Sequence, residues 1–206
     1  MLELINLGGW VMYLILGCSI VALGFVIERF LTFHYARCDM QSFFPPLENA
    51  IRLGKTNDAI AHCETSKALV PQLLLLGLKH KDEKIEDVRQ IMVDEIQVHV
   101  LPELQKNLNI LATIAKAAPM LGLLGTVLGM ISMFQNIAKI GLGDPQKLSN
   151  DIGYALVTTA GGLMVTIPII LIHAYFYGQI RNFERELFHY LTRFLRALRK
   201  RKEVAQ

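Results

Sequence analysis

The stretch Ala117–Ile137, AAPMLGLLGTVLGMISMFQNI, is a run of 21 residues without a formal charge. As an α-helix it would span about 30 Å, the thickness of the hydrocarbon core of a bilayer. The stretch therefore predicts a transmembrane helix. Pro119 lies near its start and removes one backbone donor, which predicts a local bend.

Small residues recur along one face of this predicted helix. At 100° per residue, Ala118, Gly122, Gly125 and Gly129 fall within an arc of roughly 60°, with Thr126 beside them. Because helices associate in lipid through close backbone approach, such a stripe indicates contact with another helix. One interpretation is that the glycines only pack one helix of a multi-span protein. The other is that they hold copies of the chain together.

Two further segments have the length and composition of membrane spans. Leu7–Ile27 is again 21 residues without a charge, closed by Glu28 and Arg29. Ile152–Ile180 has no charge except a titratable His173. Each is long enough to cross the hydrocarbon core as a helix. Three spans would place the two ends of the chain on opposite sides of the membrane.

Charge predicts the orientation of these spans. Residues 181–206 carry eight Lys/Arg against three Asp/Glu and form a basic amphipathic pattern, which the positive-inside rule places in the cytoplasm. The stripe of that pattern could lie on lipid, although packing against protein is favoured. The predicted order is a periplasmic N-terminus (1–6), a first span (7–27), a cytoplasmic helical module (28–116), a second span (117–137), a periplasmic loop (138–151), a third span (152–177) and a cytoplasmic basic amphipathic helix (178–206).

The remaining sequence predicts helices in water. The chain is 52% hydrophobic, yet the segment before the second span is rich in charges. Pro45 and Pro46 are expected to separate two helices, and Pro102 to bend the helix that leads into the second span. No strand pattern or hairpin dipeptide occurs. The predicted fold class is an all-α integral membrane protein with three transmembrane helices and long cytoplasmic helical extensions.

The third predicted span carries a stripe of small and polar residues. Its members share an arc of about 100° on a helical wheel: Asp151, Ala155, Thr158, Thr159, Gly162, Thr166 and His173. Threonines can bond back to their own helix, so one interpretation is helix packing. The alternative is a hydrated seam, with Thr126 as a matching hydroxyl and Asp151 as an acid at the outer mouth.

Several kinds of chemistry have no support in the sequence. Cys18, Cys38 and Cys63 are widely spaced, and no zinc or nucleotide-binding motif occurs, so neither a metal nor another cofactor is predicted. A net charge of +3 does not indicate a nucleic-acid partner. An enzyme is not expected, because no nucleophile with its base lies near a span. A passive membrane scaffold is the stronger rival to a channel.

At this point the residues resemble a known family. APMLGLLGTVLGMI at 118–131 and ALVTTAGGL at 155–163, followed by Pro168, are similar to the motifs of the MotA/TolQ/ExbB proton-channel family. Three spans make the chain more similar to the ExbB and TolQ branches than to MotA. One departure stands out: five residues before Thr159, where ExbB-type sequences often have a glutamate, this chain has Tyr154.

The resemblance implies an assembly and a function. It implies a ring-like homo-oligomer, a pentamer, in the bacterial inner membrane around ExbD/TolR-like single-span helices that supply a membrane aspartate. A TonB-like or TolA-like protein would pass on the energy of the proton-motive force, for transport across the outer membrane, for envelope maintenance or for motility. By motif position Thr126 and Thr159 would face the pore, and we also expect Thr158 and Thr166 on the ion pathway.

Overall fold

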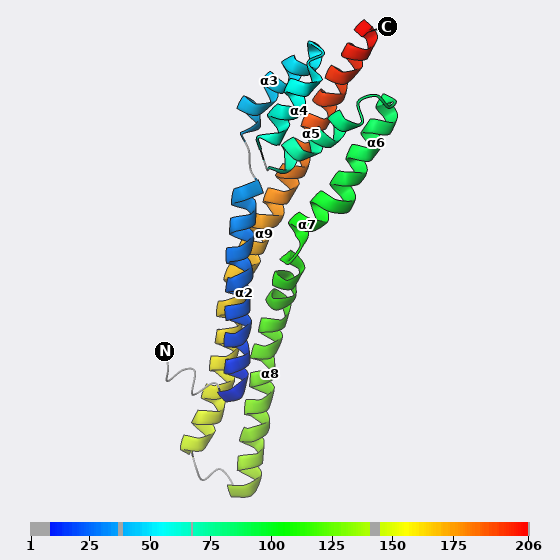
Figure 1. Cartoon of the computed structure of the whole chain (residues 1–206). Coiled ribbons are helices and arrows are strands. Elements are labelled where there is room, and N and C mark those ends of the chain that lie inside the picture. Colours follow the sequence, from blue (N-terminus) through cyan, green and yellow to red (C-terminus); the bar gives the residue numbers. More distant parts are fainter. Residues whose placement is uncertain (1–8, 37–38, 67, 141–144, 206) are drawn as a thin grey trace. The chain divides into compact units, whose positions relative to one another are not determined.

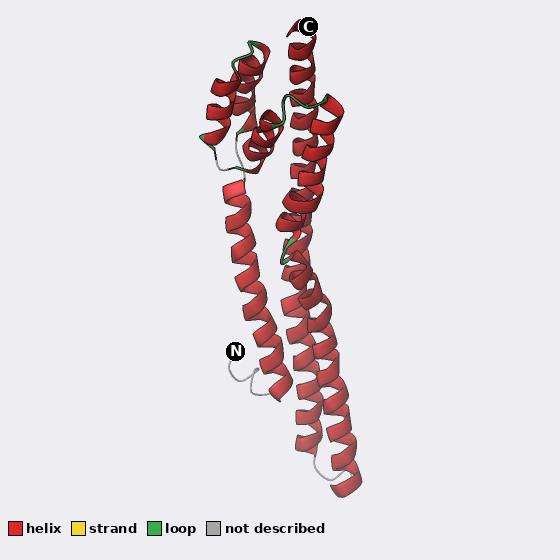
Figure 2. Cartoon of the chain, turned by 45° about the vertical axis from the view of Figure 1, so that its right-hand side comes forward, coloured by secondary structure: helices red, strands yellow, loops and turns green. Residues whose placement is uncertain are grey.

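A computed structural model of the chain describes residues 9–36, 39–66, 68–140 and 145–205. Within these ranges every regular element is a helix, which confirms the predicted all-α class (Figure 2). The chain divides into two compact units, each built from segments far apart in sequence. Unit 1 comprises Met1–Glu28 and Asn107–Phe176, and unit 2 comprises Arg29–Lys106 and Tyr177–Gln206.

Unit 1 contains the helices that can cross a membrane. It is built from most of α2 (Gly9–Ala36), from α8 (Leu108–Ile140) and from the first half of α9 (Pro145–Ala205) (Figure 1). Among the described residues, three helices are long and apolar enough to span a bilayer, and they are these three. Large apolar side chains stand on their outer surfaces, among them Met164, which is 74% exposed. Such a surface favours lipid over water, so the chain is an integral membrane protein.

The helices extend beyond the spans predicted from charge. The helix that holds the second span begins at Leu108 and contains Pro119 in its interior. The predicted loop at 138–151 is shorter in structure, since α8 continues to Ile140 and α9 starts at Pro145. The third span and the C-terminal helix form one helix of 61 residues. A charge marks where an apolar run ends, but polar residues are compatible with helix and do not end it. The predicted N-terminal segment 1–6 lies outside the described residues.

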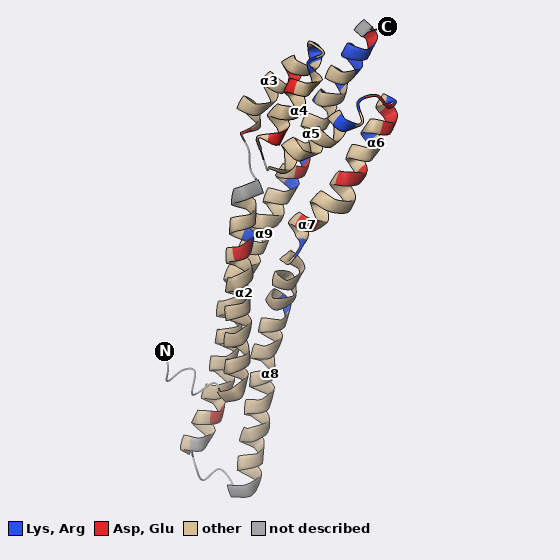
Figure 3. Ribbon diagram, viewed as in Figure 1, with Lys and Arg blue, Asp and Glu red and all other residues tan. Residues whose placement is uncertain are grey.

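Unit 2 is a bundle of shorter helices packed on the end of α9. It contains α3 (Met40–Arg52), α4 (Thr56–Glu64), α5 (Leu69–Lys79), α6 (Ile85–Glu95), a π-helix η1 (Ile96–Val100) and α7 (Leu101–Gln105). Gly77 on α5 allows close packing, because an added Cβ would lie 2.6 Å from both Met92 of α6 and Phe194 of α9. Lys, Arg, Asp and Glu are frequent on unit 2 and sparse along the helices of unit 1 (Figure 3).

The apolar stripe of the C-terminal segment packs against its own chain. Its buried members include Leu187, Leu191, Phe194 and Leu198. Phe44 of α3 lies 5.1 Å from the Tyr190 ring, centroid to centroid. Of the two alternatives for this stripe, lipid or protein, the structure therefore shows protein.

One prediction about prolines is wrong. Pro45 and Pro46 lie inside α3 rather than between helices. Burial of Phe44, Leu47 and other apolar residues on one face of α3 outweighs the backbone bonds that the prolines forfeit.

Pro102, where the sequence predicts a bend, lies directly after an irregular stretch of helix. It lies in the first turn of α7, where a missing N–H costs little, and the π-helix precedes it. The chain breaks at Asn107, whose φ of 65° lies in the left-handed region that ends a helix.

Arg29 is a buried cation that joins α2 to α7 within unit 2. Arg29 is only 3% exposed. Its Nη1 donates to the carbonyl oxygens of Glu103 and Leu104, each at 3.2 Å. These carbonyls lie in the last turn of α7, where no intrahelical donor remains and where the helix dipole favours a cation.

We predict that Arg29→Met destabilises the protein, because one buried and one partly buried carbonyl lose a charged donor. The expected loss is about 2–3 kcal/mol of unfolding free energy, read as a lower unfolding temperature in detergent. Arg89→Met on the exposed face of α6 is the matched control and should leave that temperature unchanged. Equal unfolding temperatures for the two variants would contradict the role assigned to Arg29.

Candidate functional site

The small-residue stripe of α8 packs against α9 of the same chain. An added Cβ on Gly122 would lie 3.0 Å from the carbonyl oxygen of Thr158 and 3.1 Å from Cα of Thr159. An added Cβ on Gly162 would lie 2.7 Å from the carbonyl oxygen of Ala118. The two backbones are thus in direct contact, and only glycine fits at these positions without movement.

The contact continues toward the other end of the span. A Cβ on Gly125 would overlap the side chain of Thr158, and a Cβ on Gly129 would lie 2.9 Å from the carbonyl oxygen of Asp151. All members of the predicted stripe are buried at this interface. Of the two interpretations of the stripe, contact within the chain is therefore present in the structure.

Two of the predicted pathway threonines are buried inside the subunit. Thr158 is 0% exposed and donates to the carbonyl oxygens of Tyr154 and Ala155 in its own helix, at 3.1 and 3.0 Å. Thr166 is also buried, and no partner for its Oγ1 lies among the described residues. Both side chains are therefore enclosed within the subunit, and their place on an ion pathway stays a prediction.

The other two threonines are half-buried and keep part of their surface open. Thr159 Oγ1 donates across the interface to the carbonyl oxygen of Gly122 at 3.3 Å. Thr126 Oγ1 donates to the carbonyl oxygen of Leu123 in its own helix at 2.7 Å. A hydroxyl that donates its proton keeps two lone pairs, so both side chains can still accept a hydrogen bond.

Asp151 is held by two side chains that sequence reasoning missed. Ser132 Oγ donates to one carboxylate oxygen at 3.0 Å, and Asn136 Nδ2 donates to the other at 2.7 Å. Ser132 and Asn136 lie four residues apart on α8, a spacing that puts both on one helix face and could have signalled the pair. The carboxylate therefore joins α9 to α8 at this end of the span.

Tyr154 has a packing role in the structure. An added Cβ on Gly9 would lie 2.7 Å from its ring, and one on Gly129 would lie 3.1 Å from it. The ring thus lies against the start of α2 and against α8. Gly9 has a φ of +55°, so both backbone conformation and space favour glycine there.

The part of the chain that the structure describes contains no candidate metal-binding site. No group of three His, Cys, Asp or Glu side chains in those residues could hold an ion. What the described residues provide is a membrane-embedded helix interface with two half-buried hydroxyls. This arrangement defines a helical membrane protein with three candidate spans, two of which each carry a half-buried threonine hydroxyl.

Comparison with known proteins identifies the family. Residues 65–188 match the MotA/TolQ/ExbB proton channel family, and the chain belongs to that family. The family consists of proton channels and transport components rather than enzymes.

Several relatives are named as biopolymer transport proteins. A putative biopolymer transport protein ExbB homolog of Methanothermobacter thermautotrophicus is 26% identical over 87% of this chain and 63% of its own length. Biopolymer transport protein exbB1 of Vibrio cholerae is 40% identical over 47% of this chain and 42% of its own length. ExbB of Aquifex aeolicus is 39% identical over 39% of this chain and 54% of its own length. The chain thus spans about half the length of these relatives.

We predict that Gly125→Leu destabilises the subunit itself, because the new side chain would overlap Thr158. Overpacking of this kind costs about 1–3 kcal/mol, which should lower the unfolding temperature of the detergent-solubilised chain. Gly17→Leu is the matched control, since nothing lies within 4 Å of a Cβ added at Gly17 of α2. The contrary result is an unchanged unfolding temperature together with a loss of oligomers in native mass spectrometry. It would show that the stripe acts between copies of the chain.

Proposed function

We propose that the chain is the channel subunit of a motor complex in the bacterial inner membrane. The complex would use the proton-motive force to drive energy-dependent transport across the outer membrane, as an ExbB-like protein. The names of the relatives support the transport role, and family membership supports the proton as the ion.

The proposal rests on two half-buried threonine hydroxyls in spans that contain no acidic residue of their own. Neither 117–137 nor 152–177 contains an Asp or Glu, so this chain has no carboxylate of its own inside these spans. Thr126 and Thr159 keep free lone pairs on half-buried hydroxyls. They can accept a hydrogen bond from a protonated carboxyl group that a partner brings into the membrane.

The partners that we propose are those that the family resemblance implies. Single-span ExbD/TolR-like helices would supply the membrane aspartate, and a ring of identical subunits, a pentamer, would surround them. A TonB-like or TolA-like protein would receive the work. The spans lie in lipid, and the basic segment after the third span favours a cytoplasmic C-terminus with the N-terminus and the residues between α8 and α9 in the periplasm.

We predict that Thr159→Val lowers gradient-driven activity while the complex still assembles. Valine keeps the shape of threonine but removes the hydroxyl, which leaves the partner carboxyl group without its acceptor at a cost of about 1–3 kcal/mol. Activity should therefore fall about tenfold or more. The measurement is proton flux into liposomes that contain the purified complex of this chain with its single-span partner.

The neighbouring residue provides the control. Thr158→Val makes the same chemical change at a buried site whose hydroxyl bonds to its own helix, so its flux should match that of the parent complex. Undiminished flux in Thr159→Val at the parent yield would show that this hydroxyl only packs. No flux in the parent complex, with or without the partner, would favour a passive scaffold.

The proposed orientation predicts which cysteines react with a membrane-impermeant maleimide. In a variant without native cysteines, Gly143→Cys should be labelled on intact cells. Leu53→Cys, at a position that is 72% exposed in unit 2, should be labelled only after permeabilisation. The reverse pattern would overturn the orientation.

Cys63 is unsuitable as a native reporter of orientation. Its side chain is fully buried, and burial together with the nearby Glu64 carboxylate raises the pKa of the thiol to about 12. Since only the thiolate reacts, Cys63 should stay unlabelled from either side at neutral pH. This explains why the test needs Leu53→Cys.

A further inference from the structure

A basic cavity lies between α3 and α9 within unit 2. Its volume is about 380 Å³, which is within the usual range for small-molecule sites. Its cations are Arg52, Arg193, Arg196, Arg199 and Lys200. The carboxylates of Glu48 and Glu203 oppose them, so the lining carries a net charge of +3. The net charge of the whole chain is also +3, so the charges of all residues outside the cavity sum to zero. The net positive charge of the chain therefore lies at this cavity.

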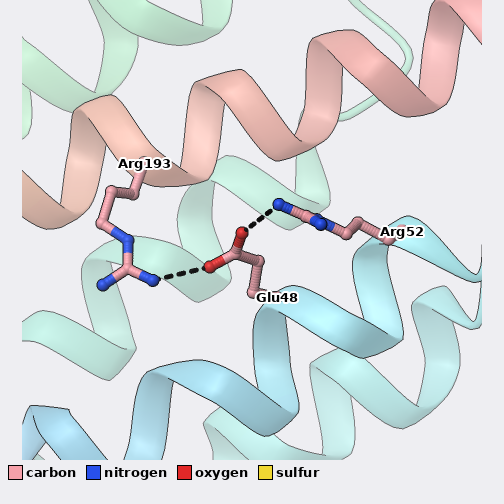
Figure 4. A network of polar contacts seen from close by, with 3 residues as sticks. All are labelled: Glu48, Arg52 and Arg193. Atoms are coloured by element: carbon pink, nitrogen blue, oxygen red, sulfur yellow. Dashed lines mark hydrogen bonds and ion pairs between the residues drawn. The ribbon is translucent and has the colours of Figure 1, made fainter.

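Part of the cavity wall is fixed by a polar network. Glu48, whose side chain is 17% exposed, accepts a hydrogen bond from Arg52 at 2.6 Å and another from Arg193 at 2.8 Å (Figure 4). The Arg193 guanidinium also lies 4.4 Å from the centroid of the Phe44 ring. These contacts orient two guanidinium groups, one from each helix, before any ligand arrives.

Neighbouring carboxylates neutralise the other cations of the cavity weakly or not at all. Arg196 and Lys200 lie one turn apart on α9, where like charges repel. In the described part of the chain, neither has a carboxylate within ion-pair distance. Arg199 pairs with Glu203 at 3.1 Å, but both side chains are largely exposed, so that pair is weak. A bound anion would relieve this repulsion.

We propose that the cavity binds a phosphate-bearing anion with at least two negative charges. Guanidinium groups match phosphate oxygens through paired N–H donors, and several converging cations favour a multivalent anion over chloride. Arg193 follows Tyr177, the end of the predicted third span, by 16 residues, a rise of about 24 Å along the helix. This distance favours a soluble phosphate compound over a lipid headgroup.

The test is a calorimetric titration of the full chain with inorganic pyrophosphate, in nanodiscs of phosphatidylcholine at low ionic strength. We expect saturable binding at one site per chain. Arg196→Gln and Lys200→Gln should each weaken it about tenfold, since each removes a charged donor. Glu203→Gln should strengthen it. Arg185→Gln removes a cation from the same helix outside the cavity and should leave the affinity unchanged.

Two results would overturn the proposal. One is no saturable binding by the parent chain. The other is an equal loss in Arg185→Gln and Arg196→Gln, which would mean that only net charge matters. Nanodiscs rich in phosphatidic acid, whose phosphomonoester headgroup can carry two negative charges, distinguish the two sources of phosphate. A headgroup in the cavity would weaken pyrophosphate binding by the parent chain but not by Arg196→Gln, whereas an equal effect on both identifies a soluble ligand.

Discussion

Direct backbone contact between α8 and α9 is the constraint on which unit 1 depends. Gly122 and Gly162 bring two main chains together where lipid offers no hydrophobic force between helices. Close approach increases the number of van der Waals contacts, which are weak individually and large in sum. The same approach brings the Ser132 and Asn136 side chains to Asp151 and the Thr159 hydroxyl to the Gly122 carbonyl. The polar contacts thus follow from the absence of side chains at the glycines.

The sequence predicted the features that depend on composition and period. Three apolar runs predicted three membrane helices, and small residues three and four apart on α8 predicted a helix contact. It could not predict α3, because a proline penalty of about 3 kcal/mol is outweighed only by packing partners far away in the chain. Nor could it predict that the break falls at Asn107, since the left-handed conformation of an asparagine depends on its surroundings.

Adjacent residues show the limit of a helical wheel most clearly. Thr158 and Thr159 fall in the same arc, yet one is fully buried and the other is half-exposed. A step of 100° is enough to move a side chain from the centre of an interface to its edge. The wheel supplies the angle between the two residues, but the position of the neighbouring helix decides which of them is enclosed. That position depends on Gly125, because the Thr158 side chain fills the space that a Cβ at residue 125 would need.

Packing and ion conduction were alternatives for the hydroxyl stripe, but the geometry joins them. Thr159 can reach the Gly122 carbonyl only because Gly122 has no side chain in the way. That hydrogen bond uses the hydroxyl proton and leaves both lone pairs of Thr159 available. A hydroxyl held in this manner is an acceptor of fixed direction, and fixed acceptors need no reorganisation when a protonated carboxyl group arrives. In the proposed channel, the glycine contact therefore prepares the threonine for its partner.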